Sequence, residues 1–439
     1  MRKLLSLLLV SMMLISLCVP TLAFSEGEKR VIRIGTWWSP YYTSEHTDIH
    51  DDPNLSDEDV AQTRLDNLRA IEEKYNCEIY YENLTWEGTI ESINTSIMAG
   101  TPDCDIYVAD LQFGLPAVLN GYAQALEDFL PADSDVLGEQ KIMEHLNVLG
   151  MDKNYLFAEV SSAVKGFPLA FNMTMIEEAG LENPQDVYDK GEWTWDKFAE
   201  YLIALTKDID NDNVVDVYGY GGWWTNMLSQ MLMANNAGIA NSKTEELSSF
   251  KTIEVLEFIN KMYNVDKTAR PWDTSDWNIN TKVYADGKIA FWPAAAWVLS
   301  ENGNSDLPFE IGVVPWPYGP SGTKESSQRY NTSGNWMFIP VGVENPELVY
   351  NILFDYLNWY QGDTSLRDNT EWEENMFMTE RNYEMAKESS QTGSFDIWGT
   401  LGGGFSLVTL MDGTETPSQL AEAWKLIIQG ELDAYFGGN

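Results

Sequence analysis

The strongest constraint on the fold is an alternation of strand-like and helix-like hydrophobic patterns near the start of the chain. Residues 31–35, 77–81 and 105–109 are short apolar runs that indicate buried strands. Between them, residues 57–75 and 88–99 repeat apolar side chains at helical spacing. This strand–helix–strand–helix–strand order predicts a parallel sheet with helices packed on it.

A second α/β unit is expected from about residue 160 onward. Thr194 can cap a helix whose apolar face holds Trp195, and Gly430 is expected to end the last amphipathic helix. Residues 361–416 show no clean periodicity and are expected to be mostly loop with short helices. The other predicted strands cover 163–171, 287–292 and 311–315, and the other predicted helices cover 250–263, 346–359 and 418–429.

Residues 1–23 have the features of a secretory signal peptide. Arg2 and Lys3 precede an apolar run that is short for a transmembrane helix, and small residues lead to a cleavage site after Ala23. The alternatives are an uncleaved membrane anchor and a lipid attached at Cys18, which we disfavour because Leu17 is bulky for a lipoprotein signal. We therefore expect an exported protein.

Charge and cysteine content narrow the classes of partner. The formal net charge is -41, from 27 Lys and Arg against 68 Asp and Glu, so the surface repels nucleic acid and anionic lipid. We find no cluster of basic residues that would hold an anionic ligand. Cys77 and Cys104 each begin a strand-like run, which favours small buried hydrophobes over a disulfide.

Aromatic residues are unusually abundant, with 17 Trp, 21 Tyr and 17 Phe. Many of the tryptophans stand beside Gly, Pro or Asn, in sequence contexts typical of loops. Because an exposed indole lowers solubility, tryptophans in loops indicate a ligand with an apolar face.

Four segments carry a family resemblance by their order and spacing. They are 99–103 with 120–126, 166–172 with 179–181 and 193–196, 286–291 with Trp297, and 312–317 followed by the helix after Pro346. With these segments the chain resembles the extracellular solute-binding proteins that include maltose-binding protein. It departs from the family pattern at Phe171, where relatives often carry Tyr, and at 294–296, where a Gly often precedes the tryptophan.

The resemblance implies an α/β fold of the type II periplasmic-binding-protein kind, with a helical C-terminal region. The expected lobes are 31–157 plus 314–345 and 158–313 plus 346–439, with hinge crossovers near 156–160 and 313–317. It further implies a monomeric receptor that closes on a sugar or oligosaccharide and delivers it to the permease subunits of an ABC importer.

The candidate ligand-binding residues are mainly aromatic. Trp297 and Phe171 match positions where the family stacks sugars, while Asp110 is a candidate acceptor for sugar hydroxyls. Core packing is the alternative for the two aromatic residues, and helix capping is the alternative for Asp110. The full set is Trp297, Trp37, Trp38, Asp110, Phe171, Trp223, Trp224 and Trp336, with one residue of each Trp pair expected to pack. Trp193, Trp195 and Trp292 are assigned to packing.

One segment has the spacing of a calcium loop. Asp208, Asp210, Asp212 and Asp216 alternate as oxygen ligands, and Val214 can add a carbonyl. Gly219 stands where such loops carry their bidentate Glu, so a solvated acidic turn is the alternative. We expect at most a structural ion and no required cofactor.

Catalytic signatures are poor. The chain has three histidines and no nucleophile elbow, phosphate loop or CxxC pair. We therefore expect no catalytic residues. The alternative functions are a secreted glycoside hydrolase, since acid pairs are abundant, and a carbohydrate sensor that is not coupled to transport.

Overall fold

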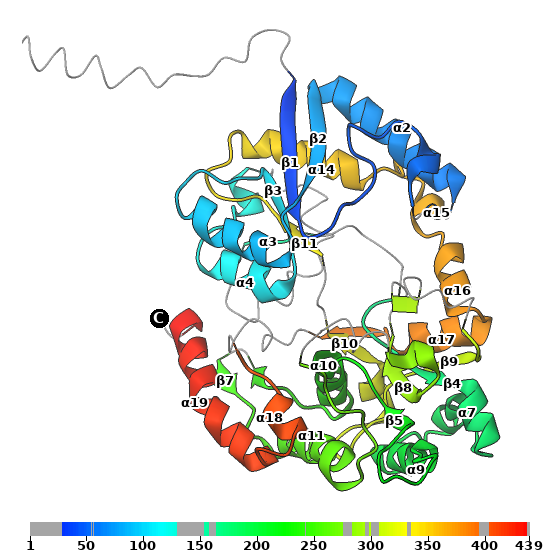
Figure 1. The fold of residues 1–439 in the computed structure, drawn as a ribbon. Coiled ribbons are helices and arrows are strands. Elements are labelled where there is room, and N and C mark those ends of the chain that lie inside the picture. Colours follow the sequence, from blue (N-terminus) through cyan, green and yellow to red (C-terminus); the bar gives the residue numbers. More distant parts are fainter. Residues whose placement is uncertain are drawn as a thin grey trace, which may run out of the picture.

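The protein forms two α/β lobes, one above the other in Figure 1. This computed structural model describes residues 29–53, 55, 57–129, 153–157, 164–241, 243–274, 283–294, 298–299, 307–331, 335–394 and 404–436. The fold is that of the type II periplasmic binding proteins, as the resemblance implied. Among the described residues, no helix has the length and apolar content needed to cross a bilayer.

The first lobe contains a four-stranded sheet in the order β11-β3-β1-β2. Its strands are β1 (Arg30–Thr36), β2 (Cys77–Asn83), β3 (Ile106–Ala109) and β11 (Trp336–Phe338). β1 is parallel to β2 and β3, which confirms the strand–helix alternation, while β11 is antiparallel to β3. The helices of this lobe are α2 (Glu58–Tyr75), α3 (Trp86–Ser92), α4 (Leu111–Leu119) and α14 (Pro346–Leu357).

Helix α2 illustrates how the sequence sets these elements. Asp57 caps its first turn by accepting from the Val60 N–H at 3.0 Å, and Asn76 ends it in the left-handed conformation. Its apolar stripe is buried together with residues of β1, β2 and α14 in one cluster. The lobe therefore buries the face of the sheet that α2 and α14 cover.

The second lobe contains a sheet in the order β5-β8-β4-β9. Its strands are β4 (Leu169–Asn172), β5 (Tyr218–Tyr220), β8 (Ile289–Pro293) and β9 (Ile311–Val314), with a small hairpin of β6 (Ala240–Asn241) and β7 (Thr244–Glu245). Helices α7 (Met173–Glu178), α8 (Pro184–Asp189), α9 (Trp195–Leu205), α10 (Trp224–Ala234), α11 (Phe250–Asn260), α17 (Glu380–Glu388), α18 (Val408–Met411) and α19 (Pro417–Phe436) belong to it. Thr194 caps α9 as expected. Trp193, Trp195 and Trp292 are buried, so their assignment to packing is confirmed.

A buried amide ties α17 to the second sheet. Asn382 donates to the Ile311 carbonyl at 2.9 Å and accepts from the Val313 N–H at 3.0 Å. It also accepts from Gln185 at 2.9 Å and donates to the Phe377 carbonyl at 3.0 Å. The Asn382 side chain thus makes four hydrogen bonds with buried protein groups, and these bonds fix α17 against β9.

The chain passes between the lobes three times. Phe157 pairs with Met337 in the first lobe, whereas Val164 packs in the second. Asn331 of β10 (Arg329–Asn331) lies in the second lobe and Trp336 in the first. The third passage runs from α14 through α15 (Thr364–Arg367) to α16 (Glu371–Phe377), along one side of the molecule in Figure 1.

These contacts differ from the expected lobe boundaries in two places. Residues 315–331 pack on the second lobe, where Trp316 donates to the Phe167 carbonyl at 2.7 Å and Ser326 to the Ala234 carbonyl at 2.7 Å. Helix α14 packs on α2 of the first lobe, because its apolar face completes the cluster that α2 begins. The second passage, which returns the chain to the first lobe, therefore falls after residue 331, and the third passage follows α14.

The C-terminal region corrects one expectation and confirms another. Gly430 lies inside α19 instead of ending it, because Leu432 and Phe436 continue the buried stripe. Residues 361–416 do contain short helices, together with β12 (Thr392–Ser394), which pairs in parallel with β10. Cys77 and Cys104 are buried free thiols, as expected.

Candidate functional site

The carboxyl edge of the first sheet gathers residues from three separate loops. β1 ends at Thr36, β2 at Asn83 and β3 at Ala109, and the three strands are parallel. Chain segments that leave such strands meet at one edge, where ligands of open α/β sheets bind. Trp37 and Trp38 follow β1, Trp86 follows β2, and Asp110 and Phe113 follow β3.

Four of these residues form an aromatic cluster, which we define as Trp37, Trp38, Trp86 and Phe113. The ring centroid of Trp37 lies 4.8 Å from that of Trp38, 5.1 Å from Trp86 and 5.6 Å from Phe113, all edge to face. Phe113 is buried, whereas the three indoles are partly exposed. Each indole can therefore pack against the cluster and still present apolar surface to a ligand.

Backbone strain marks the start of the helix that carries Trp86. Thr85 caps α3 with φ 66° and ψ 170°, a conformation that L-residues rarely adopt. Its hydroxyl accepts from the Gly88 N–H at 3.3 Å, and its N–H donates to Asn83 at 3.1 Å. These bonds fix the backbone at the start of α3 and thereby the position of the Trp86 side chain.

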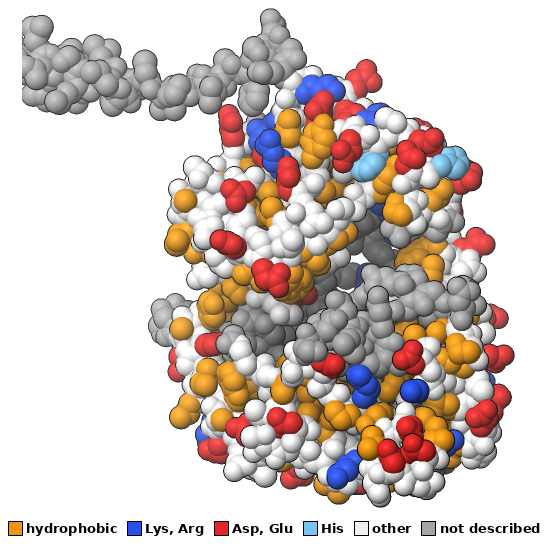
Figure 2. Space-filling view, viewed as in Figure 1, with side chains coloured by type: hydrophobic (Ala, Val, Ile, Leu, Met, Phe, Trp, Pro, Cys, Tyr) orange, Lys and Arg blue, Asp and Glu red, His pale blue; other side chains and the backbone are white. Residues whose placement is uncertain are grey.

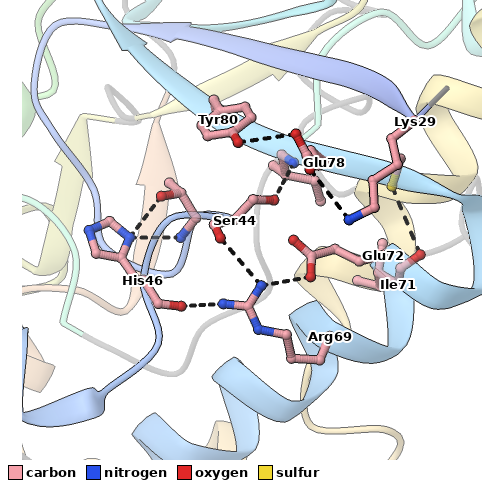
Figure 3. Close-up of polar contacts among 11 residues, drawn as sticks. Lys29, Ser44, His46, Arg69, Ile71, Glu72, Glu78 and Tyr80 are labelled. Atoms are coloured by element: carbon pink, nitrogen blue, oxygen red, sulfur yellow. Dashed lines mark hydrogen bonds and ion pairs between the residues drawn. The ribbon is translucent and has the colours of Figure 1, made fainter.

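The loop after β1 is fastened to the outer side of the lobe. Ser44 exchanges two bonds with Ile79 of β2, one from its N–H at 2.9 Å and one to its hydroxyl at 2.7 Å. Arg69 of α2 donates to the carbonyls of Ser44 and His46 and to Glu72 (Figure 3). These bonds tie the loop that begins with Trp37 and Trp38 to β2 and α2, which restricts its movement.

Asp110 is the acidic group of this edge. It caps α4 by accepting from the Gln112 N–H at 2.9 Å, so the capping role is confirmed. Burial raises the pKa of its carboxyl to about 6, with the Gln112 bond opposing the shift. One of its oxygens thus remains available as an acceptor of unusual basicity.

Two neighbouring polar groups are buried without a hydrogen-bond partner in the described part of the chain. They are the hydroxyl of Thr36 and the indole N–H of Trp336, which sits opposite Ala109 in the sheet. Asn226 and Ser229 on α10 of the second lobe each have a buried polar side-chain atom that likewise has no hydrogen-bond partner among the described residues. Buried polar atoms almost always have a partner, so a bound polar ligand is a natural candidate for one.

One expected contact residue, Phe171, belongs to the core instead, and of the Trp223–Trp224 pair Trp224 is the residue that packs, as expected for one of the two. Phe171 is 0% exposed, and its ring covers Gly312 of β9 and lies 5.9 Å from the ring of Phe291. Trp224 is 6% exposed at the start of α10, while Trp223 stays half-buried with its ring edge-on to Phe167. Trp297 lies outside the described residues.

Trp86 and Phe113 were missed from the sequence. Trp86 lies just before the predicted helix of residues 88–99, and Phe113 lies in a segment for which no element was predicted. The available signal was position, because both follow a predicted parallel strand, as Trp37 does.

The acidic loop brings three of its predicted ligands together. Carboxylate oxygens of Asp208, Asp210 and Asp216 all lie within 4.8 Å of one another. Asp212 instead accepts from the Val214 N–H at 2.7 Å. Asn211 and Asn213 have φ of 62° and 70°, which gives the loop its tight turns.

Acidic side chains are spread over both lobes on the face drawn in Figure 2. The described residues at the first-lobe edge combine flat rings, one carboxylate and neutral donors. Such a set can hold a ligand that has an apolar face and hydroxyl groups.

Solved structures with the same fold bind different ligands. An ABC substrate-binding protein from Listeria monocytogenes in complex with cycloalternan is 14% identical, with a TM-score of 0.66 over 94% of this chain and 100% of that chain. An ABC transporter solute-binding protein from Thermotoga lettingae bound with α-D-tagatose is 16% identical, with a TM-score of 0.63 over 92% and 100%. UgpB from Mycobacterium tuberculosis in complex with glycerophosphocholine is 14% identical, with a TM-score of 0.64 over 93% and 99%.

The sequence comparisons agree with the fold. No curated protein sequence matches the chain. The family model for bacterial extracellular solute-binding proteins matches residues 58–365 of the 439. The chain is therefore a member of the bacterial extracellular solute-binding protein family.

Proposed function

We propose that the protein is the receptor of an ABC importer and captures an uncharged sugar or oligosaccharide between its lobes. The observation that carries this proposal is the edge of the first sheet, where the aromatic cluster stands beside Asp110 and the buried polar atoms of Thr36 and Trp336. Indole faces cover the C–H face of a sugar ring, and the polar groups bind its hydroxyl rim. The sugar ligands of two structural neighbours agree with this class of ligand.

In the proposed mechanism, the ligand binds first to the aromatic edge of the first lobe. The second lobe then closes over it and brings Asn226, Ser229 and Trp223 toward its exposed side. Only a ligand that touches both lobes favours the closed form, because a ligand shifts an equilibrium only by its differential affinity. The proposed contacts are Trp37, Trp38, Trp86, Asp110, Trp223, Trp297 and Trp336.

The setting of this function is also part of the proposal. Residues 1–23 act as a signal peptide, and the exported protein works as a monomer that presents its ligand to permease subunits. The protein has no chemistry of its own in this scheme. Cleavage after Ala23, in place of a lipid at Cys18, is expected to appear in the mass of the mature N-terminus.

A glycan panel tests the ligand class. Purified protein is titrated with neutral mono- and oligosaccharides while tryptophan fluorescence is followed, and we expect a saturable change with at least one sugar. Trp86→Ala should abolish that binding, whereas Trp372→Ala, which removes an indole that is 39% exposed on α16, should leave it intact. Binding of glycerophosphodiesters or peptides with no response to any sugar would refute the proposal.

We further propose that the acidic loop of Asp208, Asp210 and Asp216 holds a structural calcium ion. Three carboxylates this close repel one another, and calcium accepts such oxygen ligands in flexible geometry. Millimolar calcium should raise the melting temperature of the protein and not that of an Asp210→Asn variant, with magnesium as the comparison. Equal melting curves with and without calcium would show that the loop is a solvated acidic turn.

A further inference from the structure

The second-lobe ends of all three passages meet on one short stretch of chain. This stretch, which we call the basal segment, is residues 371–394 and comprises α16, α17 and β12. The third passage leads directly into it through α16, as the course of α15, α16 and α17 in Figure 1 shows. Just before it, Asn369 donates to Asp57, the cap of α2 in the first lobe, at 3.0 Å.

The first passage enters the second lobe against the basal segment. The N–H of Val164 donates to both carboxylate oxygens of Glu373 at 3.0 Å. The next residue, Lys165, donates its N–H to the Ser390 hydroxyl at 3.1 Å, and that hydroxyl donates back to the Lys165 carbonyl at 2.7 Å. Two successive residues are thus held by α16 and by the end of α17.

The second passage leaves the second lobe from the same segment. β10, the last described element before this passage, pairs in parallel with β12 over three residues. The Gln391 N–H donates to the Gln328 carbonyl at 3.0 Å, which extends the contact. The second-lobe ends of the three passages are therefore connected through residues 371–394.

Glu373 is unusual among the groups that make this connection. It is 1% exposed, and no ion pair to it occurs among the described residues. Burial raises the pKa of its carboxyl, while the Val164 N–H and the charges of Lys165 and Lys387 lower it. Burying a carboxylate with no cation within ion-pair distance costs free energy of folding, and the two bonds from the Val164 N–H offset part of that cost.

We propose that Glu373 is a positioning residue for ligand capture: it fixes the second-lobe end of the first passage to the helix that receives the third, so that the passages bend together. This role rests on the proposed closure of the lobes on a ligand. A charged acceptor serves it well, because hydrogen bonds to a carboxylate are roughly twice as strong as neutral ones.

Three variants test the role: Glu373→Ala removes the acceptor, Glu373→Gln keeps a neutral one, and Glu374→Gln is the control on the exposed side of the same helix. Hydrogen exchange of the Val164 amide is measured first, without ligand. We expect exchange about tenfold faster in Glu373→Ala, an intermediate rate in Glu373→Gln and no change in the control. Unchanged exchange in Glu373→Ala would overturn the proposal.

Affinity and stability are then compared. For the sugar identified by the panel, we expect affinity to fall about fivefold in Glu373→Gln, since coupled bending is lost, while its melting temperature at pH 7 stays equal or rises. The wild-type melting temperature should fall as pH rises through the raised pKa of Glu373, and this part of the pH dependence should be missing in Glu373→Gln, where Lys165, Lys387 and Tyr383 remain and Asp110 keeps its own contribution. If Glu373→Gln lost stability and affinity together, Glu373 would have only a structural role. If no sugar binds at all, the proposed function fails, but the hydrogen exchange of the Val164 amide still tests whether Glu373 fixes the first passage to α16.

Discussion

Substituting Asp110 by Asn separates the charge of this residue from its role as a helix cap. Asn caps helices as well as Asp does, so the bond to the Gln112 N–H is expected to survive and α4 to stay in place. What the change removes is a carboxylate whose pKa burial raises to about 6. The variant therefore reports on the charge that we assign to binding sugar hydroxyls.

The magnitude follows from that pKa. At pH 8 nearly all molecules carry ionised Asp110, whereas at pH 5 only about one in ten does. If the ligand requires the ionised form, its dissociation constant should rise roughly tenfold between pH 8 and pH 5, which corresponds to about 1.4 kcal/mol. The Asp110→Asn variant should bind more weakly at pH 8 and show no such dependence.

Stability is expected to change in the opposite direction. The folded-state pKa lies above the ordinary value of 3.8, so the contribution of neutral Asp110 to stability is present at low pH and lost as pH rises through about 6. At pH 7, Asp110→Asn should therefore raise the free energy of unfolding, by at most about 3 kcal/mol. A charged group that lowers the stability of the free protein but strengthens ligand binding is typical of a binding site.

Isothermal titration with the identified sugar, at several pH values between 5 and 8, measures the first effect. Urea denaturation measures the second. Asp48 raises the pKa of His50 and burial raises that of Glu373, but both groups are present in the wild type and the variant, so their contributions cancel in the comparison. A wild-type affinity that does not vary with pH, or a variant that keeps the full dependence, would refute the assignment.

Three further substitutions test the packing of the second lobe by urea denaturation. In Gly312→Ala, a Cβ would lie 2.0 Å from Cζ of Phe171, so we expect a loss of about 3 kcal/mol, and a loss below 0.5 kcal/mol would contradict the observed packing. Gly430→Ala meets no atom within 4 Å inside α19 and should instead gain up to about 1 kcal/mol; a loss would mean that the helix does end near this residue. Asn382→Leu leaves four buried hydrogen-bonding groups without their partner and should cost roughly 4 kcal/mol, and a change within 1 kcal/mol would show that the neighbouring backbone finds other partners.

Much of the fold was predictable because hydrophobic periodicity is local. The spacing of apolar residues identified β1, β2, β3, α2 and α3, and their order implied the parallel sheet, whereas α4 and β11 were not predicted. Periodicity does not say which neighbour an apolar face will meet, so α14 was assigned to the wrong lobe. Gly430 was misread because an isolated glycine ends a helix only where the apolar stripe also stops.

The candidate site was only partly predictable, for a related reason. Position after a strand correctly placed Trp37, Trp38 and Asp110 at one edge of the sheet. Sequence gives no measure of side-chain burial, so Phe171 was expected at the ligand and lies in the core, and the sequence did not say which of Trp223 and Trp224 would pack. Trp86 was passed over because an indole between a predicted strand and a predicted helix looks the same whether it packs or binds.

The discontinuous first lobe has a consequence for how the chain assembles during synthesis. β3 finds its outer neighbour only in β11, more than two hundred positions later, and α2 waits still longer for α14. A nascent chain that has reached Asn331 already holds β4, β5, β8 and β9, yet one edge of β3 is open and the part of α2 that α14 covers is exposed. Distant pairings form slowly, and open strand edges recruit other chains. Synthesis halted just before Trp336 should thus yield the most aggregation-prone fragment of this protein, and release a few dozen residues later should relieve it.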